Sequence, residues 1–553
     1  MLKRFIPAAD WLANYNREDF NGDLSAGIIV AVMLIPQGMA YAMLAGLPPV
    51  IGLYAATIPL IVYALFGTSR QLAVGPVAMV SLLVFAGVSP IAEPGSTQYI
   101  SLVLLLMLMI GVIQFLMGVL RLGFLVNFLS HAVISGFTSA AAIIIGLSQL
   151  KHLLGISIES SNVFLILLET VQKLTEINWL AFAIGGGSIL LLLFLKKYAR
   201  KIPGPLAAVV GSILVVYFLN LHEYGISIVG DVPKGLPALS LPSFTTDEFI
   251  ALLPAALTIS FIGFMESIAM AKAIAAREKY KIDPNKELVG LGLANVAGSF
   301  FSAYPVTGGF SRSAVNYQAG ARTPLATIIT AILILLTLQF FTGLFYYLPQ
   351  AVLAAIIMVA VYSLIDLKEA KYLFQVKRLD GWTWVVTFVA TLAIGIEQGI
   401  IIGAVFSLLI FIGRSAYPHV AELGFLQGQN IYRNIERHPE AQTEEDILIF
   451  RVDASLYFAN IAFLENKLCD RVRDKSNVKW VIFDFSGVNS IDAIATRGME
   501  EVMESCGEGK ITYLFTHVKG PVMDLFKKAK WDEKYKEQLT FSSINQAIQF
   551  INK

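Results

Sequence analysis

Long apolar runs, separated by short polar stretches, fill the chain from residue 24 to residue 413. The runs that come before the polar stretch 222–248 cover residues 24–41, 49–66, 75–88, 98–120, 125–148, 178–195 and 204–219. Those that follow it cover residues 249–273, 287–302, 310–320, 323–345, 349–364, 382–396 and 399–413. A helix needs about 20 apolar residues to cross the hydrocarbon core of a bilayer. The pattern therefore predicts an α-helical membrane protein with fourteen segments, seven in each half.

A shorter amphipathic piece, residues 162–174, interrupts the first set of runs. It carries Glu169 and Lys173 among its leucines. Such a segment favours a helix that lies in the membrane interface, so we leave it out of the count.

Composition agrees with the pattern of runs. The chain has 553 residues, is 56% hydrophobic and only 15% charged, and has a mean hydropathy of +0.68. These values exclude an ordinary soluble globular protein. The N-terminal segment 1–23 has basic residues but no apolar core followed by a small-residue cleavage site, so we do not expect a removed signal peptide.

The distribution of lysine and arginine tests the proposed topology independently. With both termini in the cytoplasm, nineteen Lys and Arg residues up to residue 413 fall in cytoplasmic segments, and only Lys151, Lys173 and Lys234 fall outside. This bias is the one expected of cytoplasmic loops. An odd number of segments per half gives the two halves opposite orientations, an inverted repeat that is typical of secondary transporters.

The third run of each half is short and opens on a break in the helical pattern. Gly75 and Pro76 open the first of these runs, and Gly308 and Gly309 open the second. Interrupted segments at matching positions indicate a binding site near the middle of the membrane, because the N-termini of half-helices carry free amide groups and positive dipole ends. Such a site suits an anion.

Charged and polar residues near these breaks are candidates for that site. Arg312 follows the second break by three residues, between Ser311 and Ser313, which have hydroxyl groups to offer an oxyanion. A mid-membrane arginine is costly, so it should face substrate or water, pair with a carboxylate, or extend to the interface. We expect it to face an anion.

Glu266 stands in the middle of the first run of the second half, with apolar residues around it. Burial there favours a neutral carboxyl and hence a proton acceptor, whereas Arg312 or a bound cation favours the charged form; a packing role is the alternative. In the first run of the first half, Gln37 and Tyr41 are four residues apart and so share a helix face. They either line a pocket or join helices.

From about residue 441 the sequence pattern changes to one that predicts alternating strands and amphipathic helices. The order is strand, helix, strand, helix, strand, helix, which predicts a small α/β domain. Cys469 and Cys506 lie in this tail and give no disulfide framework or metal spacing, so we expect free thiols. The segment "FSGVNS" lacks the lysine and spacing of a phosphate-binding loop. We expect no enzyme activity, cofactor or metal.

Four stretches resemble the SulP anion-transporter family, which includes pendrin and prestin. They are "PQGMAYAMLAGLPPVIGLYAA" (36–56), "GTSRQLAVGPVAM" (67–79), "GFMESIAMAKAIA" (263–275) and "GGFSRSAVNYQAGARTPLATII" (308–329). The resemblance implies a core and a gate domain that work as an elevator. It implies that the substrate contacts are Gln37, Tyr41, Gly75, Gly309, Phe310, Ser311 and Arg312, with Glu266 at the coupling-ion position.

The tail resembles the STAS domain that ends such proteins. In soluble relatives, the anti-sigma-factor antagonists, a serine that follows an aspartate is phosphorylated, but here Ala493 follows Asp492. That departure argues against the same switch, while Ser490 and Thr496 stay open as other acceptors. A packing and dimerisation role is the favoured interpretation.

Together these features predict the following organisation. Residues 1–420 form the membrane domain, with repeats at about 24–220 and 249–414; residues 421–440 form a linker, and residues 441–553 the STAS domain. We expect proton-coupled uptake of sulfate or a similar oxyanion across the cell membrane, by a homodimer whose tail has a possible cytoplasmic partner. We expect contact with membrane lipid and none with nucleic acid. The alternatives are sodium-coupled bicarbonate uptake, proton-coupled dicarboxylate uptake and an anion channel.

Overall fold

The structure is a computed structural model. It describes residues 7–13, 15–124, 130–158, 160, 163–199, 203–241, 245–429, 431–475, 477–506 and 510–553. The chain divides into two compact units, residues 1–407 and 408–553. Helix α20 (Ile396–Ala416) begins in the first unit and ends in the second.

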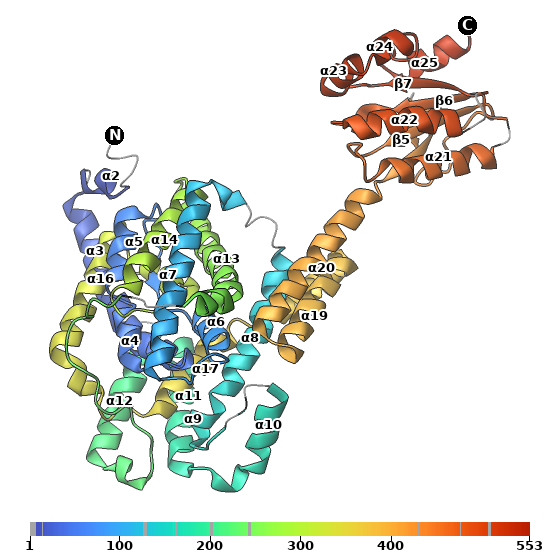
Figure 1. The fold of residues 1–553 in the computed structure, drawn as a ribbon. Coiled ribbons are helices and arrows are strands. Elements are labelled where there is room, and N and C mark those ends of the chain that lie inside the picture. The colour runs from blue at the N-terminus through green and yellow to red at the C-terminus, as the bar shows by residue number, and fades with distance from the viewer. Residues whose placement is uncertain are drawn as a thin grey trace. The chain divides into compact units, whose positions relative to one another are not determined.

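The first unit is almost entirely helical (Figure 1). Its remaining helices are α2 (Ala8–Ala13), α3 (Arg17–Leu44), α4 (Pro49–Tyr54), α5 (Ile58–Phe66), α6 (Ala78–Val88), α7 (Thr97–Val119), α8 (His131–Ser148), α9 (Leu150–Leu154), α10 (Val163–Gln172), α11 (Trp179–Tyr198), α12 (Gly204–Phe218), α13 (Thr246–Arg277), α14 (Pro284–Ser299), α15 (Phe310–Gln318), α16 (Leu325–Leu336), α17 (Gln350–Tyr362), α18 (Leu367–Val376) and α19 (Arg378–Ala393). Its strands are β1 (Val74–Gly75) and β2 (Thr307–Gly308).

Within the described ranges, nine helices or helix pairs are long and apolar enough to cross a membrane. Each of the fourteen predicted runs contains at least part of a helix, although residues 125–129 of one run lie outside the described residues. Helix α10 lies within the amphipathic piece 162–174. The number of spanning segments stays a prediction.

Helix ends follow local chemistry. Asn16 caps α3 by accepting from the backbone N–H of Asp19 at 2.9 Å. At α13, Thr245 and Glu248 form a reciprocal capping box. Each arrangement satisfies backbone donors that have no partner inside the first helical turn. These signals explain why α3 and α13 begin several residues before their apolar runs.

Glycines allow close packing between the two halves of the first unit. Helices α7 and α14 lie side by side (Figure 1). A Cβ atom on Gly111 would lie 2.6 Å from the backbone nitrogen of Val296, and one on Gly292 would lie 2.5 Å from that of Phe115. In a membrane, where lipid is as apolar as a side chain, close backbone approach of this kind supplies the packing energy.

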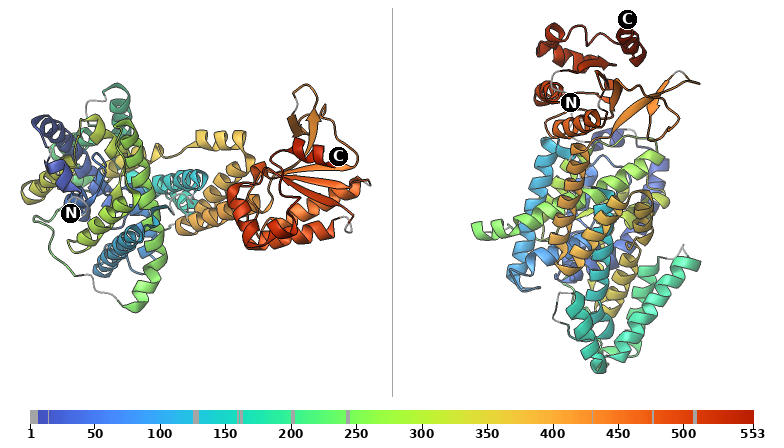
Figure 2. Two further views of the ribbon diagram at one scale, coloured as in Figure 1. Left: turned by 90° about the horizontal axis from the view of Figure 1, so that it is seen from above. Right: turned by 90° about the vertical axis from the view of Figure 1, so that its right-hand side faces the viewer.

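The second unit is a five-stranded sheet with helices on both faces (Figures 1 and 2). Its elements are β3 (Val420–Leu426), β4 (Ile431–Asn434), β5 (Ile447–Val452), α21 (Ile461–Asp474), β6 (Trp480–Asp484), α22 (Ala493–Ser505), β7 (Thr512–Thr516), α23 (Gly520–Lys528), α24 (Trp531–Lys534) and α25 (Ile544–Ile551). The strand order is β4-β3-β5-β6-β7, and β5, β6 and β7 are parallel. The predicted alternation of strands and helices is confirmed.

Alternate residues of β5 face opposite sides of this sheet. Leu448 and Phe450 pack in the core beneath α21, α22 and α23, whereas Ile447 and Ile449 pack with Ile544 of α25. Because side chains of a strand alternate between faces, an almost continuous apolar strand is buried on both sides.

Residues 421–440 contain strands where the sequence suggested a linker. Strand β3 pairs antiparallel with β5 and with β4, so this segment extends the sheet. Its side chains at Ala421 and Leu423 pack in the core of the second unit. Burial of alternate residues therefore stabilises a strand here, although the surrounding sequence is polar.

The expectation of free thiols in the tail was wrong. Cys469 of α21 and Cys506, directly after α22, form a disulfide with their Cα atoms 5.0 Å apart. The two helices pack against each other, which brings residues 37 positions apart in the sequence within bonding distance. The spacing of two cysteines does not reveal such a contact.

Candidate functional site

The two interrupted segments meet inside the first unit. Strands β1 and β2 pair antiparallel, with Val74 opposite Gly308 and Gly75 opposite Thr307. Helix α6 begins three residues after β1, and α15 begins two residues after β2. Neither helix has a side-chain cap at its N-terminus. The sequence thus folds locally into two half-helices whose positive ends adjoin one short ladder.

Arg312 lies in the first turn of α15 and only 3% of its surface is exposed. Its Nε donates to the carbonyl oxygen of Ala73 at 3.2 Å, and its Nη1 donates to that of Pro76 at 2.9 Å. Its third nitrogen, Nη2, is buried and has no hydrogen-bond partner among the described residues. A buried donor without an acceptor is costly, so an acceptor that reached Nη2 would relieve this cost.

The glycines at both breaks give the guanidinium room. A Cβ on Gly75 would lie 3.1 Å from Nη2 of Arg312, and a Cβ on Gly309 would lie 3.2 Å from the same atom. Gly75 also has a φ of +149°, a conformation that side-chain-bearing residues rarely adopt. Both predicted glycines therefore lie against the predicted arginine.

Glu266 lies on α13, and its Oε2 is buried without a hydrogen-bond partner in the described part of the chain. The carboxyl of Glu266 and the hydroxyl of Tyr41 on α3 both lie near Arg312. Gln37, one helical turn before Tyr41, is buried as well. The structure brings Tyr41, Glu266 and Arg312 into one neighbourhood.

The two residues between Gly309 and Arg312 differ from their neighbours. Phe310 is 44% exposed, and Ser311 is also exposed. Ser313 is instead fully buried, and its hydroxyl accepts from the backbone N–H of Ala73 at 2.9 Å. Of the two serines beside Arg312, it is therefore Ser313 that holds the first break.

A directed chain of hydrogen bonds joins α13 to the second break. The backbone N–H of Gly308 donates to the hydroxyl of Ser267 at 2.8 Å, and the hydroxyls of Ser267 and Thr307 are 2.6 Å apart. The hydroxyl of Thr307 donates to the carbonyl of Gly263. Since that proton is committed, Ser267 must donate to Thr307. The residue after Glu266 thereby fixes β2.

Tyr304 and Ser81 form a similar contact that sequence analysis did not identify. Their hydroxyl oxygens are 3.0 Å apart, and Ser81 donates to the carbonyl of Val77 at 2.9 Å. Tyr304 therefore donates to Ser81 and ties the segment before β2 to α6. The only signal in the sequence is a tyrosine directly before a proline and the second glycine break.

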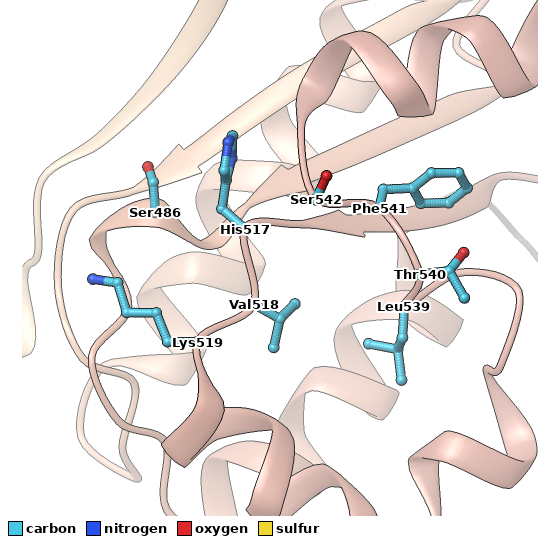
Figure 3. Close-up of a pocket in the computed structure, with 8 residues that line it drawn as sticks. All are labelled: Ser486, His517, Val518, Lys519, Leu539, Thr540, Phe541 and Ser542. Carbon is cyan, nitrogen blue, oxygen red and sulfur yellow. The ribbon is translucent and has the colours of Figure 1, made fainter.

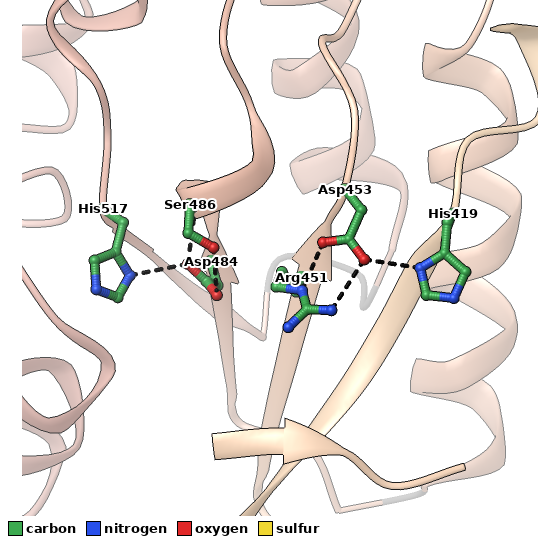
Figure 4. A network of polar contacts seen from close by, with 6 residues as sticks. All are labelled: His419, Arg451, Asp453, Asp484, Ser486 and His517. Carbon is green, nitrogen blue, oxygen red and sulfur yellow. Dashed lines mark hydrogen bonds and ion pairs between the residues drawn. The ribbon is translucent and has the colours of Figure 1, made fainter. Parts of the chain in front are cut away.

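The second unit has a separate pocket of about 530 Å³ at the carboxyl ends of β6 and β7 (Figure 3). Its lining residues are Ser486, His517, Val518, Lys519, Leu539, Thr540, Phe541 and Ser542. Beside it, the buried carboxylate of Asp484 accepts from Nδ1 of His517 at 2.9 Å and from Ser486 (Figure 4). In parallel α/β sheets this edge is where ligands commonly bind.

The region of the suspected phosphorylation switch is occupied by structural contacts. Asp492 caps α22 by accepting from the N–H of Ala495 at 2.7 Å, and it also accepts from the N–H of Phe458. Thr496 is buried and donates to the carbonyl of Asp492, whereas Ser490 is exposed. Of the two hydroxyls left open, Ser490 is the accessible one.

Comparison with known proteins gives two family matches. A model described as "Sulfate permease family" matches residues 20–387, and one described as "STAS domain" matches residues 438–547. One relative is "Sulfate transporter 4.1, chloroplastic" of Arabidopsis thaliana, which is 42% identical over 91% of this chain and 76% of its own length.

Two solved structures are also similar. The chain resembles the murine Solute Carrier 26 family member A9 anion transporter in the inward-facing state, with a TM-score of 0.93 and 24% identity over 99% of this chain and 94% of that one. It resembles the transmembrane domain of the cyanobacterial bicarbonate transporter BicA, with a TM-score of 0.61 and 25% identity over 71% of this chain and 98% of that one.

Proposed function

The chain belongs to the sulfate permease family, and on this premise we propose that it takes up sulfate or a similar oxyanion by secondary active transport coupled to protons. Members of this family are multi-pass membrane proteins that transport anions, and they are transporters, not enzymes. The proposal adds the cargo, the coupling ion and the residues. Its cargo is supported by relatives named sulfate transporters.

The observation that carries the proposal is Nη2 of Arg312, a donor that has no acceptor among the residues that the structure describes. This donor is buried beside the N-termini of α6 and α15. An oxyanion there accepts from Nη2 and from amide groups at the two helix starts, and both half-helix dipoles favour its charge. We call this proposed binding site the anion seat. It is built around Gly75, Gly309 and Arg312, with Phe310 and Ser311 in the first turn of α15. Gln37 and Tyr41 of α3 form its opposite wall.

Glu266 is proposed as the proton site. Its buried Oε2 has no hydrogen-bond partner within the described residues, so protonation of this carboxyl breaks no contact there. A proton that binds at Glu266 offsets part of the charge that a dianion carries through the membrane, which is costly when uncompensated. The electrostatic interaction with Arg312 links this proton to the anion seat.

The proposal includes the wider organisation. We assign transport to residues 1–420, in inverted repeats at about 24–220 and 249–414 with fourteen segments, and regulation or assembly to a cytoplasmic tail from about residue 441. Both termini are cytoplasmic in this scheme and the protein acts as a homodimer by an elevator movement. The strands within 421–440 join the tail's sheet.

One observation favours a second cargo. A similar solved structure is that of a bicarbonate transporter, and a seat built from helix N-termini and one arginine accepts any small oxyanion. Sodium-coupled uptake of bicarbonate is therefore the second candidate.

The test is uptake of radiolabelled sulfate into proteoliposomes. Accumulation should rise with an inward proton gradient and should be unchanged by sodium. Unlabelled bicarbonate at about fifty-fold excess should leave most uptake intact, a ratio that reveals a competitor about ten times weaker. Bicarbonate uptake driven by sodium, with no sulfate uptake, would exclude the named cargo and coupling ion.

A further inference from the structure

Glu287 is a buried carboxylate with no assigned role. It lies in the first turn of α14, and its exposed fraction is 0%. It accepts hydrogen bonds from the hydroxyl of Tyr63 at 2.6 Å, from the backbone N–H of Thr68 at 2.6 Å and from that of Ser69 at 2.9 Å. The hydroxyl of Thr68 donates to it as well. Glu287 lies in the second half of the first unit, and all four donors lie in the first half.

Every one of these partners donates. A carboxylate has acceptor sites for about four donors, and hydrogen bonds to a charged group are the stronger ones. No lysine, arginine or histidine forms an ion pair with Glu287 within the described ranges. The hydrogen bonds from Thr68 and Ser69 therefore fix the position of the Glu287 carboxylate and, equally, the position of the backbone at Thr68 and Ser69.

The same segment runs directly into the anion seat. After Ser69, the side-chain amide oxygen of Gln71 accepts from the hydroxyl of Tyr280 at 2.9 Å. The backbone carbonyl of Gln71 accepts from the side-chain amide of Asn316 at 2.9 Å. The next carbonyl in contact is that of Ala73, which accepts from Arg312. From Thr68 to Ala73 the chain is thus fixed by groups of the second half, and Glu287 holds its beginning.

We propose that Glu287 is a positioning residue for the anion seat. It fixes the segment 68–73, and through it the Ala73 and Pro76 carbonyls that aim the guanidinium of Arg312. The inference rests on the proposed function of that seat. Loss of the carboxylate leaves two backbone N–H groups and two hydroxyls to find other acceptors, and the carbonyls that orient Arg312 then lose their fixed place.

The chain supplies a closely matched control. Asp23 on α3 is also 0% exposed and accepts from two successive backbone N–H groups, those of Arg322 at 2.8 Å and Thr323 at 2.9 Å. The hydroxyls of Thr323 and Tyr15 donate to it too. Asp23 thus accepts from the same types of donor as Glu287 does. The segment that it contacts, Arg322 and Thr323, follows the C-terminal end of α15. The Arg312 contacts lie at the other end of that helix.

The experiment compares Glu287→Gln with Asp23→Asn in the full-length protein. Sulfate KM and Vmax are measured in proteoliposomes, and amide hydrogen exchange is followed in the peptide that covers residues 68–77. We expect Glu287→Gln to raise KM at least about tenfold and to speed exchange in that peptide. Asp23→Asn, with a similar loss of thermal stability, should leave KM within about twofold and exchange in residues 68–77 unchanged.

Two outcomes overturn the inference. One is an unchanged KM and unchanged exchange in Glu287→Gln. The other is an equal rise in KM in both variants, since that reports general destabilisation. If Glu287→Gln does not fold, Thr68→Val tests the same point, because it removes one donor at the segment. Should the wild-type protein fail to transport sulfate, the proposed cargo falls while the exchange comparison still decides whether Glu287 fixes the segment.

Discussion

The guanidinium of Arg312 lies against the backbone of Gly75, so closely that a Cβ on this glycine would be 3.1 Å from Nη2. The arginine belongs to the second half of the membrane unit and the glycine to the first. One donor of the guanidinium stays free at this contact among the described residues.

Gly75→Ala should raise the KM for the anion about tenfold or more. The new methyl group approaches Nη2, and a residue with a Cβ is strained at a φ of +149°, a conformation that costs roughly 1–3 kcal/mol. Uptake kinetics in proteoliposomes measure the effect. Gly95→Ala is the control, because Gly95 has a φ of +80° but no atom of the described residues lies within 4 Å of an added Cβ. Equal effects in both variants would show that strain alone is responsible.

Arg312→Ala should weaken anion binding by roughly 10- to 150-fold, the range for loss of a hydrogen bond to a charged group at about 1.5–3 kcal/mol. Arg312→Lys should not restore it, because a lysine cannot donate to the Ala73 and Pro76 carbonyls in the planar geometry of the guanidinium. Equilibrium binding of labelled sulfate is the measurement. Arg322→Lys, at an exposed ion pair with Glu18, should bind normally.

Glu266→Gln should abolish the stimulation of uptake by a proton gradient while anion exchange across the membrane continues. The amide keeps the shape of the side chain but takes up no proton in this pH range. Uptake is compared at several imposed gradients. Glu248→Gln, in the capping box of the same helix, should keep full proton stimulation. A Glu266→Gln protein that still responds to the gradient would remove this residue from the coupling step.

Ser267→Ala should destabilise the protein by about 1–3 kcal/mol and lower the affinity for the anion. The change leaves the N–H of Gly308 without its buried acceptor and Thr307 without a donor. A shift in the thermal unfolding of the detergent-solubilised protein reports the first effect and sulfate binding the second. Ser363→Ala, at an exposed serine directly after α17 whose hydroxyl donates to the carbonyl of Ala360, should change neither.

Asp453→Asn should destabilise the second unit at neutral pH, by about 1 kcal/mol after allowance for partial exposure. Burial alone raises the pKa of Asp453, but hydrogen bonds from Arg451 and His419 outweigh it and hold that pKa below its ordinary value (Figure 4). The stabilisation is therefore present above the ordinary value of 3.8 and is lost as the pH falls through the lower folded-state pKa.

Limited proteolysis of the full-length chain at pH 7 and at pH 3 checks this sign. The difference between Asp453→Asn and wild type should be larger at pH 7. Asp470→Asn breaks an exposed pair with Arg473 and should have little effect at either pH. A larger defect at the acidic pH would contradict the prediction.

Sequence periodicity located the helices well, because apolar run length and charge bias respond directly to the membrane. It also placed Arg312 at the start of a broken helix. It did not reveal which atoms hold the guanidinium, since the acceptors are carbonyls of Ala73 and Pro76, more than 200 residues away along the chain. Every residue has a backbone carbonyl, so the amino-acid sequence does not show which carbonyls accept from the arginine.

Glu287 was missed for a related reason. In the sequence it is an ordinary acidic residue in the first turn of a helix, where a carboxylate is favourable even when exposed. Only its contacts with Thr68 and Ser69 distinguish it. The Cys469–Cys506 disulfide and the strands within 421–440 likewise depend on packing between segments that are distant in the chain.

The ladder between β1 and β2 places a condition on how the protein is made. Val74 and Gly75 leave the ribosome 232 or more residues before their partners, Thr307 and Gly308, and at about 5–20 residues per second that interval lasts roughly ten to fifty seconds. During that interval β1 has no partner strand. The ladder, and with it the contact between Gly75 and Arg312, therefore forms only after the second half has been made.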